Sequence, residues 1–396
     1  MTDRQSLRFE VLHRGGDRPG WHGRRGRVTT PHGSFETPAF MPVATAAAMK
    51  GLTPLQVRGT GSECILNNAF HLLLRPGAQR VEALGGVHTF MRWNGPILTD
   101  SGGFQAFSMA QINRIDEDGV AFRSFIDGAQ VHLGPESSMA VQQSLGADIA
   151  MAFDDCPPAG DAIPQSQRRT RTLEAKDRTL RWLARCIGAH RRSDQALFAI
   201  IQGGTELDLR TASVNESCAF DLPGYAIGGV AVGEGTDAIE RVVRHTTPLL
   251  PLDRPRYLMG VGYPRDIVMA VESGVDMFDC VLPTRNGRNG MVFTRDGSIR
   301  LRNAVHSVDA RPIEADCDCE ACAGGFSRAY LRHLFMASEM LGPTLASLHN
   351  IRFFQRLLLD IRHAIEDDAW LHFRNRWPCV NQVHGSTPQE TGATDD

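Results

Sequence analysis

The chain has no long hydrophobic run and no excess of charge of either sign. None of its apolar stretches approaches the roughly 20 residues of a membrane-spanning helix, and the polar start "MTDRQSLRFE" does not resemble a signal peptide. We therefore expect a cytoplasmic protein without membrane contact. A net charge of -3 over 396 residues gives no global sign of a polyanionic partner, so any nucleic-acid surface must be a local patch.

A disulfide framework is missing as well. The nine cysteines are odd in number and dispersed, except for three between Cys317 and Cys322. This usage fits a reducing cytoplasm with one metal site. No internal repeat or long linker divides the chain, and its hydrophobic content of 42% is enough to bury a large core.

The main pattern that is present consists of eight short apolar runs. They are "PAFMPVAT", "CILNN", "PILTDSGG", "DIAMAFDDCPP", "ALFAIIQGG", "GYAIGGVAVGE", "RYLMGVG" and "DMFDCVLPT". Runs of this length with little alternation are typical of parallel strands buried on both faces. Because several intervening segments have helical spacing, we predict an α/β fold, an eight-stranded β/α barrel with its active site at the C-terminal strand ends. The alternative, an open doubly wound sheet, needs a phosphate-binding glycine motif that "PVATAAAMKG" does not supply.

The remaining segments are expected to surround a single catalytic domain, residues 1–396. Residues from about 1 to 40 predict an irregular N-terminal layer with possible hairpin strands, and the polar tail from about 385 to 396 predicts disorder. Residues 165–192 combine helical apolar spacing with nine Lys or Arg residues. A solvated outer helix is favoured there over an RNA-binding surface.

The polar and glycine residues that end the runs should meet at one mouth of the barrel. They are Asp100 with residues 101–105, Asp154, Asp155, Gln202 to Gly204, Gly228, Gly229 and Asp279. Asp100 and Asp279 supply the two carboxylates of a double displacement at an anomeric carbon, one as nucleophile and one for proton transfer. Read alone, "DSGG" also allows Asp100 to cap the helix that follows it.

Three further residues at this mouth suit a guanine base. A carboxylate such as Asp154 accepts two N–H bonds, as from the N1–H and N2–H₂ edge of guanine, and the Gln202 amide can donate to O6. Phe104 offers an aromatic face on which a base can stack.

The cysteine cluster "CDCEAC" is the most specific local signal. Cys317, Cys319 and Cys322 with one histidine would form a closed tetrahedral zinc site of the structural type. His349 in "LHN" is the preferred fourth ligand, and His333 is the alternative.

Arginines are concentrated near these motifs. Residues 281–302 contain five arginines and one acid, and residues 326–362 contain five arginines and two acids. Such charge beside an active-site mouth suits a phosphate backbone.

Taken together, the motifs resemble those of the bacterial tRNA-guanine transglycosylase (queuine tRNA-ribosyltransferase) family. The matching segments are "LTDSGGFQAFS", "FDDCPP", "IQGG", "GGVAVGE", "YLMGVGYPRD", "FDCVLPTRNGRNG" and "CDCEAC…HN", in the family's order. The resemblance implies an eight-stranded barrel with a zinc-binding insertion at about residues 303–350 and one structural Zn²⁺ per chain. It implies a pentosyltransferase of queuosine biosynthesis that exchanges the wobble guanine of G-U-N anticodon tRNAs for 7-aminomethyl-7-deazaguanine through a covalent Asp–ribose intermediate.

The resemblance also implies site residues. Asp279 corresponds to the nucleophile and Asp100 to the general acid/base. The implied substrate-binding residues are Asp100, Ser101, Gly102, Gly103, Phe104, Asp154, Gln202, Gly229, Val230, Val232 and Met259. The implied RNA-binding residues are Gly260, Val261, Gly262, Tyr263, Pro264, Arg265, Asp266, Thr284, Arg285, Asn286, Gly287 and Arg288. The implied metal ligands are Cys317, Cys319, Cys322 and His349.

The same resemblance implies a homodimer with Tyr330 and His333 at its interface, and tRNA with guanine or the deazaguanine base as partners. Val232 stands where the bacterial family has valine and the eukaryotic one has glycine, which favours the aminomethyl base over queuine. Two other classes of protein fit the sequence less well. A non-catalytic RNA-binding relative would not need both aspartates, and a retaining glycosidase acting on small sugars leaves the zinc module and basic loops unexplained.

Overall fold

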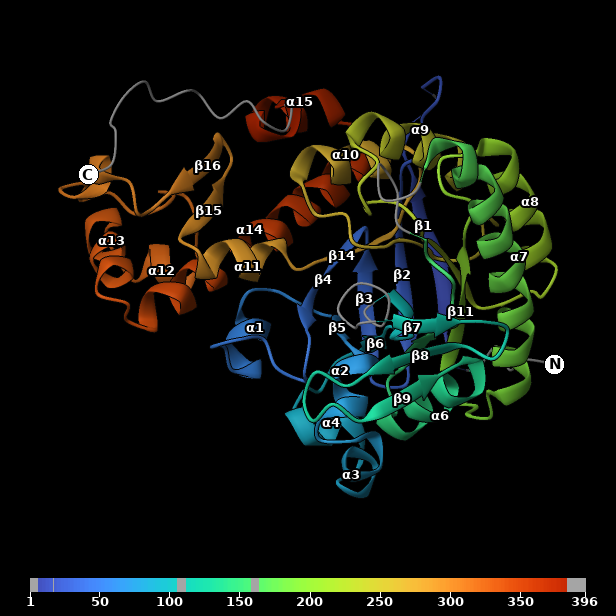
Figure 1. Cartoon of the computed structure of the whole chain (residues 1–396). Helices are drawn as coiled ribbons and strands as arrows, with labels where there is room; N and C mark the ends of the chain where they lie inside the picture. Colours follow the sequence, from blue (N-terminus) through green and yellow to red (C-terminus); the bar gives the residue numbers. More distant parts are fainter. Residues whose placement is uncertain (1–5, 17, 105–111, 158–163, 383–396) are drawn as a thin grey trace.

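The eight apolar runs form the strands of one closed parallel barrel (Figure 1) in the computed structural model, which describes residues 6–16, 18–104, 112–157 and 164–382. Around the barrel the strands are β4 (Ala39–Ala44), β5 (Ile65–Asn67), β6 (Ile97–Thr99), β10 (Ile149–Met151), β11 (Ala196–Ile201), β12 (Gly224–Ile227), β13 (Arg256–Leu258) and β14 (Met277–Cys280). The barrel closes where β14 pairs with β4, with Asp279 opposite Met41. The predicted eight-stranded β/α barrel is confirmed, and the open-sheet alternative is wrong.

The lack of alternation in the runs follows from burial on both faces of the sheet. Inward-facing side chains such as Met41, Ile200 and Tyr257 form one core inside the barrel. Outward-facing side chains such as Phe40 and Ile227 belong to a second core beneath the helices. Most strand positions are therefore apolar, and polar residues such as Asn67 of β5 and Thr99 of β6 lie mainly at the ends of the strands.

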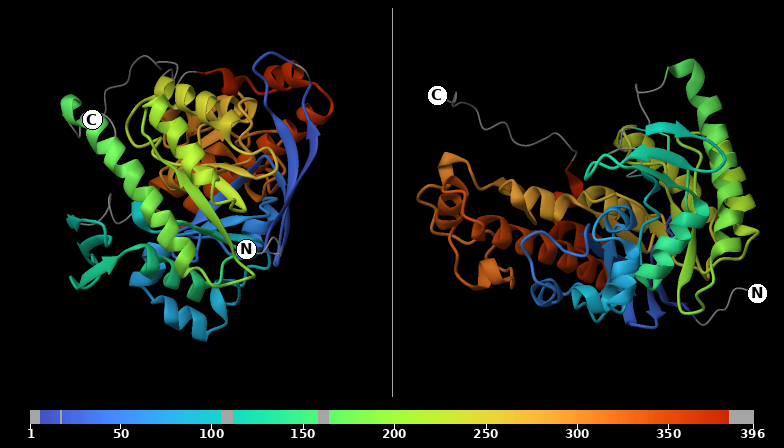
Figure 2. Two further views of the ribbon diagram at one scale, coloured as in Figure 1. Left: turned by 90° about the vertical axis from the view of Figure 1, so that its right-hand side faces the viewer. Right: turned by 60° about the horizontal axis from the view of Figure 1, so that its bottom comes forward.

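The helices surround the barrel, and Figure 2 shows them from two further sides. They are α1 (Pro54–Gly59), α2 (Ala69–Leu74), α3 (Ala78–Ala83), α4 (Gly86–Met91), α6 (Pro135–Leu145), α7 (Gln165–Ala189), α8 (Leu207–Cys218), α9 (Thr236–Thr246), α10 (Pro264–Glu272), α11 (Leu282–Arg288), α14 (Leu341–Glu366) and α15 (Trp370–Arg376), with short 3₁₀ turns η2 (Thr247–Leu249) and η4 (Pro378–Asn381). Helix α14 covers the closure of the barrel, where Phe354 stacks on Phe40 of β4 at 4.6 Å between ring centroids.

Two three-stranded antiparallel sheets lie outside the barrel. One consists of β1 (Arg8–Arg14), β2 (Arg24–Thr30) and β3 (Gly33–Thr37), and the other of β7 (Ile112–Ile115), β8 (Val120–Arg123) and β9 (Gln130–Leu133). The turn between β2 and β3 is tied to the barrel by buried Asp148, whose two carboxylate oxygens face His32 Nδ1 (2.9 Å) and His88 Nε2 (3.0 Å). The two imidazoles stack with 3.6 Å between ring centroids and 14° between ring planes, and both face this one carboxylate.

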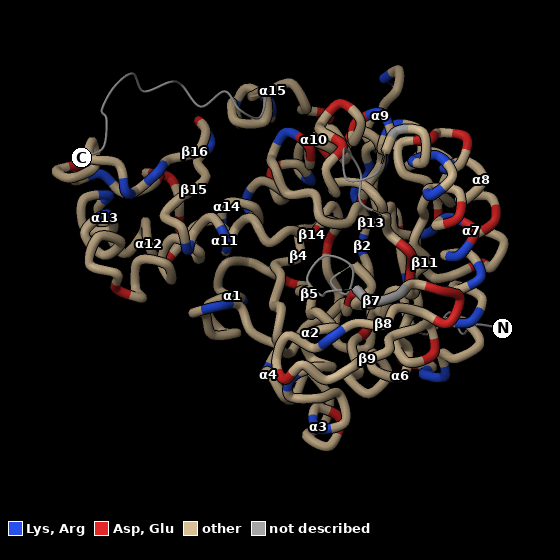
Figure 3. Tube along the Cα trace, in the orientation of Figure 1, with Lys and Arg blue, Asp and Glu red and all other residues tan. Residues whose placement is uncertain are grey.

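The basic face of α7 is neutralised by neighbouring acids. Arg169 contacts Glu206 and Asp208, Arg181 contacts Glu117, and Arg185 contacts Glu136. Figure 3 shows blue and red segments side by side along this helix. These pairs support the solvated outer helix predicted from the sequence and not an RNA-binding surface.

The segment after α11 projects from the barrel on the left of Figure 1 and has buried side chains of its own. It contains the hairpin β15 (Met291–Thr294) and β16 (Gly297–Arg300), the turn η3 (Ala304–His306), and helices α12 (Glu320–Ala323) and α13 (Arg328–Met336). Helix α14 runs from this segment back to the barrel. Within the described residues, no helix is long and apolar enough to cross a membrane. The tail predicted at about 385–396 lies outside the described residues.

Candidate active site and metal site

Asp279 lies in β14 at the C-terminal mouth of the barrel, and its hydrogen bonds fall on one oxygen. Oδ1 accepts from the Tyr257 hydroxyl at 2.6 Å and from the Gly260 N–H at 2.8 Å. No donor of the described residues reaches Oδ2, which leaves that oxygen available for covalent chemistry. Burial raises the pKa of Asp279, and these two hydrogen bonds oppose the shift.

Asp100 follows β6 directly and is held through both oxygens. The Ala69 N–H donates to Oδ1 at 2.9 Å, and Asn68 Nδ2 donates to Oδ2 at 2.7 Å. Asp100 therefore bonds the first turn of α2, a helix that precedes it in the chain. Burial, with a smaller contribution from the nearby charges of Asp279 and Asp154, raises the pKa of Asp100 to about 7 against the opposing effect of the Ala69 hydrogen bond. A carboxyl group with this pKa can both donate and accept a proton near neutral pH.

Asp154 and Gln202 lie side by side at the ends of β10 and β11. Gln202 Nε2 donates to Asp154 Oδ2 at 2.7 Å, whereas the buried Gln202 Oε1 has no hydrogen-bond partner among the described residues. Burial raises the pKa of Asp154 to about 7, opposed by the Gln202 hydrogen bond. The pair thus forms a buried polar edge with unused hydrogen-bonding capacity.

Asp155, also expected at the mouth, lies differently from Asp154. Its carboxylate binds Arg171 and Arg178 of α7, and its backbone N–H donates to Thr179 Oγ1. Adjacent residues of an extended segment point to opposite sides. Asp155 therefore anchors α7, and Asp154 is left for the site.

The glycine-rich loop after β12 is shaped by Glu234. Its carboxylate accepts the backbone N–H groups of Ala231 and Val232. Ala231 has a φ of 60°, a left-handed conformation that a non-glycine residue adopts rarely. Since the Ala231 N–H points at Glu234, the carbonyl of Val230 in the same peptide points away from Glu234.

The remaining predicted substrate-binding residues sit at neighbouring strand ends. Ser101 and Gly102 are buried behind Asp100, the Gly103 N–H donates to Ser101 Oγ, and Phe104 is exposed. Met259 is half-buried immediately after β13. The predicted RNA-binding residues follow β13 and β14: residues 260–266 enter α10, and residues 284–288 lie in α11.

The two arginine-rich segments differ in their pairing. In residues 326–362, Arg328 contacts Asp309, Arg352 contacts Asp318 and Arg356 contacts Glu314. These acids lie before residue 326 in the sequence, so the charge of residues 326–362 counted alone overestimates how basic this part of the structure is. In α11, by contrast, Arg285 is exposed and Arg288 half-buried, and no acid among the described residues pairs with either.

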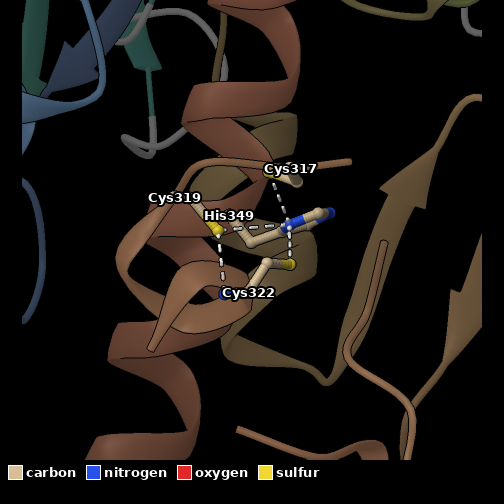
Figure 4. Close-up of side chains that lie close together, drawn as sticks. All are labelled: Cys317, Cys319, Cys322 and His349. Carbon is tan, nitrogen blue, oxygen red and sulfur yellow. Dashed lines mark hydrogen bonds between the residues drawn. The ribbon is translucent and has the colours of Figure 1, made fainter. Parts of the chain in front are cut away.

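Cys317, Cys319, Cys322 and His349 form a buried cluster (Figure 4) whose ligand atoms all lie within 4.8 Å of one another. His349 Nδ1 is 3.4–3.6 Å from the three sulfurs. Its Nε2 donates to the Phe293 carbonyl at 2.7 Å, so Nδ1 is the nitrogen with a free lone pair facing the sulfurs. Three sulfurs and one such nitrogen fit a tetrahedral metal ion. His333 is exposed on α13 and outside the cluster, so the structure selects His349 between the two sequence candidates.

Sequence reasoning missed Tyr257, Asn68 and Arg210. Tyr257 lies inside an apolar run, which predicts a core residue. Asn68 meets Asp100 only in the folded structure. Arg210 is fully buried in α8 and bonds the loops after β11 and β12. Its spacing of four from buried Val214 was an available signal that it lies on the buried face of the helix.

The closed barrel and the buried aspartates at its mouth define a β/α-barrel enzyme, and the Cys₃His cluster could hold a metal ion. The family model "Queuine tRNA-ribosyltransferase" matches residues 20–380. A protein of that name from Thermus thermophilus is 53% identical over 368 residues, covering 93% of this chain and 92% of the relative. One from Stenotrophomonas maltophilia is 51% identical over 370 residues (93% and 96%), and one from Herpetosiphon aurantiacus is 52% identical over 354 residues (89% and 88%). The chain belongs to the queuine tRNA-ribosyltransferase family, which makes it an enzyme of the pentosyltransferase class.

Proposed function

We propose that the enzyme exchanges the wobble guanine of G-U-N anticodon tRNAs for 7-aminomethyl-7-deazaguanine in queuosine biosynthesis. The observation that carries this proposal is the division of labour between two aspartates at one mouth. No donor in the described part of the chain reaches Asp279 Oδ2, and burial raises the pKa of Asp100 to about 7. Incubation with radiolabelled guanine and bulk tRNA tests the proposal, and the label should enter the tRNA. If no label is incorporated and the protein instead releases sugar from small glycosides, it is a glycosidase.

The proposed reaction has two displacements. Asp279 Oδ2 attacks ribose C1′, the C1′–N9 bond breaks with its electron pair going to guanine, and Asp100 gives the departing base a proton. The incoming base then loses a proton to Asp100, and its N9 attacks C1′ and breaks the bond to Asp279. An apolar strand end suits this chemistry because it keeps water from the sugar ester.

Base selection is proposed to depend on Asp154, Gln202 and the Gly229 N–H, which face the edge shared by guanine and the deazaguanine. Phe104 and Met259 are proposed to hold the ring from its two faces. The Val230 carbonyl, which points away from Glu234, is proposed to accept a hydrogen bond from the aminomethyl ammonium. A side-chain carbon at Gly103 would lie 3.1 Å from the Asp154 carbonyl oxygen and 3.4 Å from Asp154 Oδ1, so glycine allows a close approach to the proposed base-binding edge.

Replacing Val232 by glycine should widen the substrate range. The valine side chain would clash with the cyclopentenediol of queuine but not with an aminomethyl group, and overpacking a rigid pocket costs about 1–3 kcal/mol, roughly a tenfold to hundredfold loss of affinity. We expect Val232→Gly to incorporate queuine while keeping the aminomethyl base, measured as kcat/KM for each base. Efficient use of queuine by the unmutated enzyme would contradict this account of the pocket.

Arg285 and Arg288 are proposed to bind phosphates of the anticodon loop. Each lost contact should lower the slope of log affinity against log salt by about 0.7 for single-stranded RNA. Arg285→Ala and Arg288→Ala should therefore bind tRNA more weakly and with a shallower slope in filter-binding titrations. Arg181→Ala on α7, whose guanidinium is already paired with Glu117, is the matched control and should change neither. Weaker binding with an unchanged slope would exclude phosphate contacts.

Burial of Asp154 should cost stability at high pH. Its folded-state pKa of about 7 lies above the ordinary value of 3.8, so the unfolded chain releases this proton first and stability falls as pH rises from about 4 to about 7. Asp154→Asn, which retains an acceptor for Gln202, should therefore be more stable than wild type at pH 8, by roughly 1–3 kcal/mol, with the gain shrinking at pH 5. Urea denaturation at both pH values measures this, and equal destabilisation at both would refute it.

The metal is proposed to be one Zn²⁺ per chain, held by Cys317, Cys319, Cys322 and His349. A zinc ion there would fix the fold of a subdomain of about residues 303–350, appended to a single catalytic barrel that begins with an N-terminal layer of about residues 1–40. The nine free cysteines agree with a reducing cytoplasm as the site of action.

A second copy of the chain is the proposed partner of the exposed apolar side chains around α13. Tyr330, Met336 and Met340 are 41%, 58% and 84% exposed, and His333 is exposed beside Tyr330. Light scattering should give the mass of a dimer, and Tyr330→Asp should shift the protein toward the monomer.

A further inference from the structure

Arg210 is a buried cation beneath the proposed base pocket. It is fully buried and donates to the backbone carbonyls of Ile201 (2.9 Å), Gly204 (2.8 Å), Gly228 (2.7 Å) and Gly229 (3.1 Å). No carboxylate within the described part of the chain accepts a hydrogen bond from it. Burial lowers the pKa of Arg210 to about 10, so the guanidinium is still charged at neutral pH. A fully buried charge bonded only to carbonyls is costly, which calls for a role beyond packing.

The peptide between Gly228 and Gly229 connects this charge to the pocket. Its carbonyl accepts from Arg210 Nη1, and in a trans peptide its N–H, on Gly229, points the opposite way. Across residues 6–16, 18–104, 112–157 and 164–382, no acceptor takes that N–H. A side-chain carbon at Gly229 would lie 2.2 Å from Gln202 Oε1, so the peptide packs directly against the amide that bonds Asp154.

A peptide whose carbonyl accepts a charge-assisted hydrogen bond is polarised, and its N–H becomes a stronger donor, by about 10–30% per bond in condensed-phase estimates. We propose that Arg210 is a positioning residue of the base pocket, which holds and polarises the Gly228–Gly229 peptide so that the Gly229 N–H stabilises negative charge on the C6 oxygen of the base. This inference rests on the proposed base exchange. When the C1′–N9 bond breaks, the electron pair stays on guanine and is shared with that oxygen until Asp100 supplies a proton.

The test compares guanine with 6-thioguanine, which keeps the N1–H and N2–H₂ edge but offers a weaker acceptor at C6. The preference for guanine in kcat/KM of base incorporation should fall about 3- to 10-fold in Arg210→Met, the range of a weakened neutral hydrogen bond. In Arg210→Lys, which keeps a positive charge, the preference for guanine should fall less than in Arg210→Met. The affinity of Arg210→Lys for tRNA should equal that of the wild type. Should Arg210→Met fail to fold, the same ratio is measured on Arg210→Lys and Arg210→Gln.

Arg256 provides the matched control. It is also buried and donates to backbone carbonyls, those of Leu250 and Gly274, but at the opposite end of the barrel strands. Arg256→Lys should lower the melting temperature and leave the base preference unchanged. An unchanged preference in folded Arg210 variants, or an equal fall in Arg256→Lys, would overturn the inference. Absence of guanine incorporation by the wild type would instead count against the proposed exchange itself.

Discussion

Asp279→Asn is expected to abolish base exchange and the covalent RNA adduct together. The amide nitrogen or neutral oxygen that replaces Oδ2 is a poor nucleophile, while Tyr257 and Gly260 can still hold the side chain in place. A loss of at least about 10⁴-fold in kcat is expected, as for other essential nucleophiles. The adduct is measured on a denaturing gel and exchange by radiolabelled guanine.

Asp100→Asn is the matched control for this experiment. It retains the acceptor for Ala69 and should slow exchange severely while keeping tRNA binding near normal, because proton transfer is lost and the attacking carboxylate is not. If Asp279→Asn exchanged guanine at the wild-type rate, the assignment of the nucleophile would be wrong.

Cys319→Ser is expected to release zinc and destabilise the segment around the cluster. A structural metal contributes directly to folding free energy, so removal of one of four ligands should cost several kcal/mol. Cys319 is also the N-cap of α12, where its sulfur accepts the Cys322 N–H, so its replacement should disturb this helix as well. Metal analysis and thermal unfolding measure the two effects.

Replacing each of the two histidines in turn tests which one is a metal ligand. His349→Ala should lose zinc, because its Nδ1 faces all three sulfurs, whereas His333→Ala should keep one zinc per chain. One zinc per chain in Cys319→Ser would contradict the metal site.

The barrel could be predicted from the sequence because its strands are apolar on both faces. Such strands form short, continuous apolar runs such as "ALFAIIQGG". The mouth could be predicted in outline because parallel strands end on one side. Which strand-end residues face the mouth depends on side-chain direction, and Asp155 turned instead to Arg171 and Arg178. Tyr257 gains its role from a contact with Asp279, 22 residues away in the sequence, and Arg210 from a contact with Gly228, 18 residues away. No local sequence pattern predicts either contact.

The cysteine spacing predicted three members of the cluster, since they lie within six residues of one another. The fourth member depends on how α14 packs against α12. The sequence alone therefore could not decide between His333 and His349. The charge of residues 326–362 was overestimated for a related reason, because the acids that pair with these arginines come from outside that window.

The pairing of β14 with β4 has a consequence for synthesis of the chain on the ribosome. The strand that carries Asp279 is the last to join the barrel, and Phe354 of α14 stacks on β4 only after a further stretch of chain. Until then the nascent polypeptide has two open sheet edges, at β4 and β13, of the kind that invites pairing with other chains. A truncated translation product ending before residue 277 therefore lacks both the carboxylate and a closed barrel.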